Sequence, residues 1–341
     1  MKISIFIPVY NGTKFLPKTL ESILTQTYTE MEILCVDDSS TDESLTLLKE
    51  YASHDNRIKV FTKPNGGSVP PAWNFVIPHI HGDFVLYMSQ DDILRPDTVE
   101  RLVQRQQETN ADAVIPHEIH YCKDIPTEQL HHLKGIDGDT SPVISGKEAF
   151  RLMIDYSISG RAMWETDIVK KVGMQADTFN ADELAQRLWA LECNKVAFSD
   201  AEFLYSQDNP DAITQKMAPH IYDDTLTNAL LYRTAATNFP TETAWLHQLA
   251  GKYFHHLYLR MIQYLQQRHN YTKPERCRIK SRFQKAYHIL HHDIQTTKRK
   301  YQIAATAMPM MWSMVAYNYC KLKRKGISLD QEMDCYSYTA I

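Results

Sequence analysis

The alternation of strand patterns with helix patterns over the first 120 residues constrains the fold of this chain most. Short runs rich in β-branched and aromatic residues are each followed, after a polar turn, by apolar residues at helical spacing. Strands joined by helices through short connections predict a parallel sheet with helices on both faces. The expected fold class is therefore α/β with a mostly parallel sheet. We expect strands at residues 2–9, 32–36, 58–61, 84–88, 113–116 and 195–198.

Capping residues predict where the helices begin. Thr13 is expected to cap the first helix, and Ser40–Glu43 and Ser145–Glu148 have the spacing of a capping box. A further helix is expected over residues 97–108, and the polar stretch 121–145 is expected to run over the sheet as a long excursion.

Composition and cysteine content narrow the class of protein. The chain has 341 residues, of which 43% are hydrophobic and 23% charged, so it is not a disordered or low-complexity chain. The six cysteines form no close pair, which indicates neither a disulfide framework nor a zinc site. The apolar run at residues 1–12 is too short for a signal peptide. We expect a reduced, cytoplasmic protein.

The C-terminal third differs from the rest in pattern and charge. From residue 219 onward helix patterns dominate, so we expect one domain over 1–218 and a helical region over 219–341 that could form a homodimer contact. Residues 268–326 hold 14 Lys or Arg and two acids, whereas residues 1–267 carry a net charge of −13. Within this basic region, residues 301–320 are rich in Met and aromatics. Three interpretations stay open for them: a helix on the inner face of the cytoplasmic membrane, a helix packed against the catalytic domain, and a membrane span. No nucleic-acid-binding module is recognised.

Three polar turns are the candidate site. They follow the first, second and fourth expected strands and contain Tyr10-Asn11, Asp37-Asp38 and Asp91-Asp92. Ligands of α/β sheets bind outside the carboxyl ends of the strands, so these turns should meet at one edge. Adjacent carboxylates at Asp91-Asp92 suit a hard divalent cation, or one of them caps the next turn. Asp37-Asp38 could accept a hydrogen bond from a nucleobase or ribose, or cap a helix.

The spacing of several motifs resembles family-2 glycosyltransferases of the GT-A fold, of the type that builds bacterial surface glycans such as lipooligosaccharide or capsule. The motifs are residues 7–11 (IPVYN), 20–28 (LESILTQTY), 32–42 (EILCVDDSSTD), 65–67 (NGG) with Ala72 and Asn74, and 82–83 leading to Asp91-Asp92 and Pro96. They occur in the family's order and cover residues 1 to about 110.

The resemblance implies an inverting, metal-dependent transferase for a hexosyl or N-acetylhexosaminyl group, with a nucleotide-diphospho-sugar donor, most simply a UDP-sugar, and a glycan or glycolipid acceptor. Residues 1–120 would form the nucleotide-sugar half and 121–218 the acceptor-side half. Asp38, rather than Asp37, would bind the base and Asp91 the ribose or sugar. Asp92 would ligate Mn²⁺ or Mg²⁺, with Asp91 as the second candidate ligand. The other implied donor-binding residues are Pro8, Val9, Tyr10, Asn11, Asn65 and Gly67.

The resemblance also implies a general base and shows two departures. The base is expected at Asp182, with Glu183 as the substitute, although acids at a helix N-terminus are also favoured by the helix dipole. Ser89 stands where the family often has an acidic residue, and Trp73 where it often has arginine, which removes a possible cation from the donor site. Trp164 could stack on a sugar or belong to the core. The alternatives to a transferase are an inactive glycan- or lipid-binding scaffold on the same fold and a sugar nucleotidyltransferase.

Overall fold

The computed structural model describes residues 1–174, 178–210, 212, 218–294 and 304–324. The chain divides into two compact units. The first contains residues 1–177 and 181–212, and the second contains residues 178–180 and 213–341.

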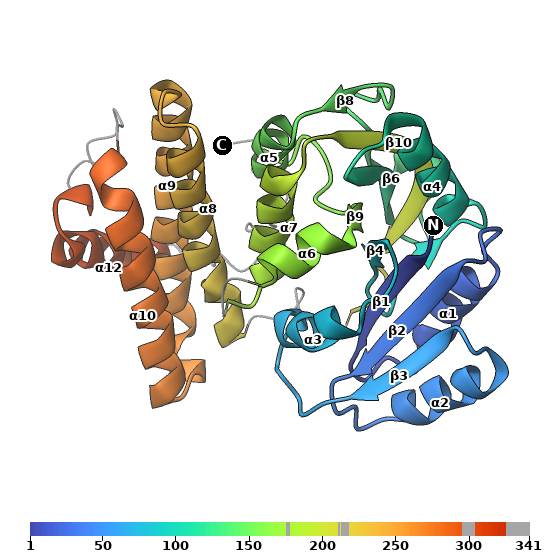
Figure 1. The fold of residues 1–341 in the computed structure, drawn as a ribbon. Helices are drawn as coiled ribbons and strands as arrows, with labels where there is room; N and C mark the ends of the chain where they lie inside the picture. Colours follow the sequence, from blue (N-terminus) through green and yellow to red (C-terminus); the bar gives the residue numbers. More distant parts are fainter. Residues whose placement is uncertain (175–177, 211, 213–217, 295–303, 325–341) are drawn as a thin grey trace. The chain divides into compact units, whose positions relative to one another are not determined.

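A ten-stranded sheet organises the first unit (Figure 1). The pairs β1–β2, β1–β4, β2–β3 and β6–β10 are parallel, and the short strands β5, β7, β8 and β9 pair antiparallel with their neighbours. In spatial order the strands are β3 (Ile58–Thr62), β2 (Met31–Asp37), β1 (Ile3–Val9), β4 (Phe84–Tyr87), β9 (Met163–Glu165), β6 (Ala113–Tyr121), β10 (Val196–Ser206) and β5 (Ile93–Leu94), with β7 (His131–Leu133) beside β6 and β8 (Val143–Ile144) beside β10.

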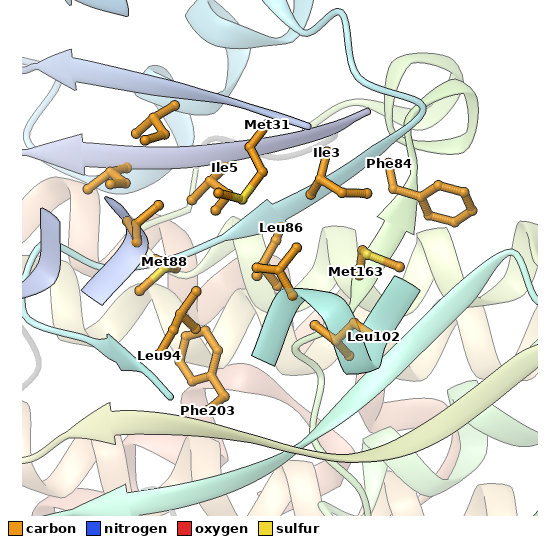
Figure 2. Packing of buried hydrophobic residues seen from close by; sticks show 14 of the residues in the cluster. Ile3, Ile5, Met31, Phe84, Leu86, Met88, Leu94, Leu102, Met163 and Phe203 are labelled. Carbon is orange, nitrogen blue, oxygen red and sulfur yellow. The ribbon is translucent and has the colours of Figure 1, made fainter. Parts of the chain in front are cut away.

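Helices cover both faces of this sheet because the side chains of its strands alternate between them. Ile5 and Ile7 of β1 lie in one core cluster, with α1, α2 and α4, while Phe6 lies in the other, with α3, α5, α6 and α7. Figure 2 shows the first cluster, in which Ile3 and Ile5 lie near Leu86 and Met31. The helices are α1 (Leu16–Leu24), α2 (Ser44–His54), α3 (Val69–Val76), α4 (Thr98–Thr109), α5 (Gly146–Ile154), α6 (Thr166–Val172) and α7 (Ala181–Glu192).

The expected α/β architecture is confirmed, and some local expectations were wrong. Thr13 does not cap α1, whose N-cap is Phe15; the Thr13 hydroxyl donates instead to Asp42. The capping box expected at Ser40–Glu43 is absent because α2 begins later, at Ser44. At α5 the expected cap is present, since Ser145 Oγ accepts the Glu148 N–H at 3.2 Å. The excursion at 121–145 contributes β7 and β8 to the sheet. Trp164 is buried in the second cluster, which confirms its core role.

The second unit is helical throughout its described residues. The 3₁₀ turn η4 (Pro219–Asp223) leads into α8 (Asp224–Asn238), which is followed by α9 (Thr243–Gln267), α10 (Lys273–Leu290) and α12 (Met308–Arg324). Two neighbouring acids fasten these helices together: Asp223 pairs with Arg278 and Arg282 of α10, and Asp224 pairs with His256 and Arg260 of α9. None of the helices described is long and apolar enough to cross a membrane.

The basic segment at the C-terminal end packs within this unit. The Trp312 ring of α12 lies 6.3 Å from that of Tyr264 and 6.2 Å from that of Phe283, and Met311 and Val315 are buried. Residues 301–303 of the segment discussed above lie outside the described residues. One face of α12 therefore packs on α9 and α10 of the second unit, whereas the packing interpretation of the sequence names the catalytic domain as its partner.

Candidate active site

The three polar turns meet at one edge of the sheet, as their strand-end positions predict. The Gln90 side chain accepts the Tyr10 N–H at 2.9 Å and donates to the Tyr10 carbonyl at 3.0 Å, which joins the turn after β1 to the turn after β4. On the other side, Asn11 Oδ1 accepts the Thr41 N–H at 2.8 Å, which joins the turn after β1 to the turn after β2. Glycine at position 12 leaves room for this Gln90 side chain, since a Cβ there would lie 2.4 Å from Gln90 Oε1.

Asp37 and Asp38 have different surroundings. Asp37 is almost fully buried, and its carboxylate accepts the Ser40 N–H, so it stabilises the turn. The carboxylate of Asp38 contacts the Lys63 ammonium and accepts the Gly66 N–H at 3.0 Å. Asp38 is therefore the acid of this pair that lies beside the Asn65-Gly66-Gly67 loop.

The other donor-site candidates fall into exposed and buried groups. Tyr10 is 46% exposed, Asn11 is exposed and Pro8 is partly buried. The loop after β3 is shaped by Asn65, whose Oδ1 accepts the Gly67 N–H at 2.7 Å, and Gly67 has a φ of +72° with open space around it. Val9 was expected beside the base, but its side chain is 1% exposed and belongs to the core cluster of Ile5 and Ile7, so it does not face a ligand.

The two acids after β4 point into different surroundings. Asp92 has no exposed surface. Its carboxylate accepts the backbone N–H of Ser89 at 2.8 Å and that of Ser206 at 3.2 Å, and lies 3.5 Å from Arg161 Nη1. Burial raises the pKa of Asp92 to about 7, and Arg161 opposes that rise. Asp91 is only partly buried and accepts a hydrogen bond from Asn209 Nδ2 at 2.7 Å.

The two candidate metal ligands therefore differ in access. The carboxylate of Asp92 is enclosed by protein donors, whereas that of Asp91 is partly exposed. Asp91 could hold a cation, because Mg²⁺ and similar cations are often held by one or two carboxylates together with substrate phosphates. Within the described part of the chain, no group of three or more His, Cys, Asp or Glu residues forms a metal centre by itself.

Arg161 contacts Asp92, and Glu118 in turn contacts Arg161. The sequence interpretation did not single out either residue. Arg161 precedes β9, and its Nε donates to Glu118 Oε2 of β6 at 3.1 Å. Glu118 also accepts the Ser159 hydroxyl at 2.6 Å and lies 3.0 Å from His120 Nε2. Burial acts against its charge, but His120, Arg161 and Ser159 hold the pKa of Glu118 at about 2. No sequence motif predicts a role for Arg161 or Glu118, because the two residues come together only when β6 and β9 pair.

The candidate bases lie in the first turn of α7. Burial, followed by the neighbouring charge of Glu183, raises the pKa of Asp182 to about 6. The charge of Asp182 contributes to the raised pKa of the Tyr87 hydroxyl, and Arg161 favours the ionised form of Asp182. Glu183 is instead ion-paired with the buried Arg187 one turn along the helix. The two acids therefore differ: the pKa of Asp182 is raised, whereas the carboxylate of Glu183 is held by Arg187.

Comparison with protein families matches residues 4–163 to the model described as Glycosyl transferase family 2. Residues 4–163 therefore form a domain of the glycosyltransferase family 2 type. The match includes all three turns of the sheet edge and extends to Met163 in β9.

Individual relatives agree with this family. The chain is 38% identical over 119 residues to the glycosyltransferase GlyG of Streptococcus pneumoniae, a match that covers 35% of this chain and 40% of GlyG. It is 25% identical over 225 residues to the putative glycosyltransferase EpsE of Bacillus subtilis, covering 63% of this chain and 81% of EpsE. The match to a second S. pneumoniae glycosyltransferase, GlyA, covers 16% of that protein. The chain thus spans less than half the length of GlyG and GlyA.

A solved structure extends the likeness in fold to nearly the whole chain. S. aureus TarS residues 1–349, crystallised with UDP-GlcNAc, superposes with a TM-score of 0.68 at 19% identity, over 96% of this chain and 92% of that one. The protein therefore has the GT-A fold with a helical C-terminal region.

Proposed function

We propose that this protein is an inverting glycosyltransferase that moves a sugar from a UDP-sugar to a hydroxyl group of a bacterial surface glycan. The observation that carries the proposal is the meeting of Asp38, Asp91 and the strand-end turns at one sheet edge within the family-2 domain. The structure of TarS with UDP-GlcNAc supports the choice of donor, and the surface-glycan setting is what the resemblance of the sequence motifs implies.

The donor would bind with its base between Tyr10 and Asp38. The Asp38 carboxylate accepts a backbone N–H and contacts an ammonium group in the free protein. The same carboxylate can accept the N3–H of uracil, for which cytosine at neutral pH has no equivalent donor. Asp91 would hold a divalent cation, Mn²⁺ or Mg²⁺, which neutralises charge on the departing diphosphate.

Asp182 would serve as the general base. It would accept the acceptor's hydroxyl proton as that oxygen bonds to the anomeric carbon and the bond from this carbon to the phosphate oxygen breaks. UDP leaves with the electron pair, and the proton stays on Asp182. The raised pKa of Asp182 suits this role, because a base with a pKa closer to the working pH binds a proton more strongly while remaining ionised.

The second unit would bring the enzyme to the inner face of the cytoplasmic membrane. Lys273, Lys280 and Lys285 are exposed on α10, and Lys321 and Lys323 are exposed near the end of α12. Clusters of basic side chains are attracted to anionic headgroups, which would place the enzyme near a lipid-linked acceptor.

The proposal is tested by measuring UDP binding and UDP-sugar hydrolysis with and without Mn²⁺. We expect Mn²⁺-dependent UDP binding that is lost in Asp91→Ala, slow hydrolysis of one UDP-sugar, and no binding of CDP. Failure to bind any nucleoside diphosphate would overturn the proposal and favour an inactive scaffold. Release of pyrophosphate from UTP and a sugar phosphate would instead indicate a nucleotidyltransferase.

A further inference from the structure

The Arg161 guanidinium has no part in the reaction proposed above, yet it lies between the carboxylates of Asp92 and Glu118. Its side chain is 14% exposed, with Nε 3.1 Å from Glu118 Oε2 and Nη1 3.5 Å from Asp92 Oδ2. The guanidinium carbon lies 4.4 Å from the centre of the Tyr205 ring in β10. Arg161 therefore joins the turn after β4 to β6 and β10.

Asp92, which Arg161 approaches, closes the turn that carries Asp91. Asp92 Oδ2 accepts the Ser89 N–H at 2.8 Å, and the Asp92 N–H donates to the Ser89 carbonyl at 3.2 Å. Asp92 Oδ1 accepts the Ser206 N–H from the end of β10 at 3.2 Å. A change in the position of the Asp92 carboxylate would therefore move the backbone on both sides of Asp91.

Glu118 holds the other side of the guanidinium. It is itself fixed by the Ser159 hydroxyl and by His120, so the direction of the Arg161 Nε–H is set by β6. A planar guanidinium can donate to two carboxylates at once, whereas the compact ammonium of lysine cannot reproduce that fork. The position of both carboxylates, those of Asp92 and Glu118, therefore requires the two-sided donor geometry of arginine at residue 161.

We propose that Arg161 is a positioning residue of the donor site: it anchors Asp92 to β6 and thereby fixes the turn that presents Asp91 to the cation and the diphosphate. This inference rests on the proposed function, because it assigns Arg161 a part in donor binding. It predicts that a change at Arg161 weakens the metal-dependent component of nucleotide binding and spares the component supplied by Asp38 and Tyr10.

The test is calorimetric titration of the full chain with UDP, with and without Mn²⁺, for the wild type and Arg161→Lys. Loss of hydrogen bonds that orient a metal ligand typically lowers metal affinity by about 10- to 100-fold. We therefore expect the gain in UDP affinity on adding Mn²⁺ to fall at least about tenfold in Arg161→Lys. UDP affinity without Mn²⁺ should stay at the wild-type value.

Arg260→Lys is the matched control. Arg260 is a buried arginine, and its guanidinium pairs with Asp224 at 2.6 Å in the second unit. This variant should lose stability while keeping the full Mn²⁺-dependent gain. A general loosening of the first unit by Arg161→Lys would weaken UDP binding equally with and without Mn²⁺, and that result would overturn the positioning role.

The two proposals fail in different ways. If the wild type shows no UDP binding at all, the proposed function fails together with this inference. If the wild type binds UDP more tightly with Mn²⁺ and Arg161→Lys shows the same gain, with a native circular dichroism spectrum, only the positioning role is overturned.

Discussion

At the scale of single residues, Asp182 should control how the reaction depends on pH. Its pKa is raised to about 6 by burial and by Glu183, and a general base must be ionised to act. The transfer rate should therefore fall about tenfold per pH unit below about 6, where an ordinary aspartate would remain active to about pH 4. A pH–rate profile with saturating donor measures this limb. An acid limb near pH 4 would contradict the assignment.

Substitution of Asp182 separates catalysis from stability. Asp182→Asn should lower the transfer rate by about 100- to 10,000-fold and leave UDP binding intact. Because the folded-state pKa is raised, Asp182 lowers the free energy of unfolding progressively as the pH rises from about 4, where an unfolded aspartate ionises, to about 6, and the loss is constant at higher pH. Asp182→Asn should therefore melt no lower than the wild type at pH 8. Glu183→Gln is the control: it removes the ion pair with Arg187, so it should lose stability and retain most of the activity.

The sequence predicted acids at the ends of β2 and β4, but it could not distinguish the two members of each pair. In the sequence, Asp91 and Asp92 are two identical residues after an apolar strand. Only the folded turn directs the Asp92 carboxylate toward the N–H groups of Ser89 and Ser206 and leaves Asp91 partly exposed. The same limit applies to Val9, whose motif neighbours Pro8 and Tyr10 are accessible while the alternation of β1 turns Val9 into the core.

At the scale of elements, the contact between the turns after β1 and β4 should be sensitive to one added methyl group. Gly12→Ala would push away Gln90, whose two hydrogen bonds to Tyr10 join these turns. Loss of two such bonds should lower the free energy of unfolding by about 1–3 kcal/mol and weaken UDP binding. Urea unfolding and UDP titration measure both effects.

Gly251 provides a control of opposite sign. It lies inside α9, and a Cβ there would meet nothing within 4 Å. Gly251→Ala should therefore raise the free energy of unfolding by about 0.5–1 kcal/mol, since alanine has the higher helix propensity. If both variants were equally destabilised, the close approach at Gly12 would not be the cause.

Elements with a long periodic pattern were predictable, and short ones were not. The strands β1, β2 and β4 follow from apolar runs, and α1 and α4 follow from helical spacing. The strands β5, β7, β8 and β9 have two or three residues each, so no periodicity can form within them. The short strand β9, which follows Arg161, nevertheless pairs with β6, which carries Glu118, and these two residues meet beside Asp92. That part of the site was therefore missed.

At the scale of the whole molecule, the separation of charge between an acidic N-terminal part and a basic segment at 268–326 predicts selective binding to anionic membranes. The full chain should co-sediment with vesicles containing phosphatidylglycerol and not with pure phosphatidylcholine, and salt should weaken the binding. Each basic side chain near such a surface contributes about 1 kcal/mol, so Lys280→Glu with Lys285→Glu should reduce binding at least about tenfold.

Lys49→Glu with Lys147→Glu is the control, because it makes the same change of net charge on exposed residues of the first unit. If both pairs reduced binding equally, net charge would govern the attraction and α10 would not be the membrane-facing surface.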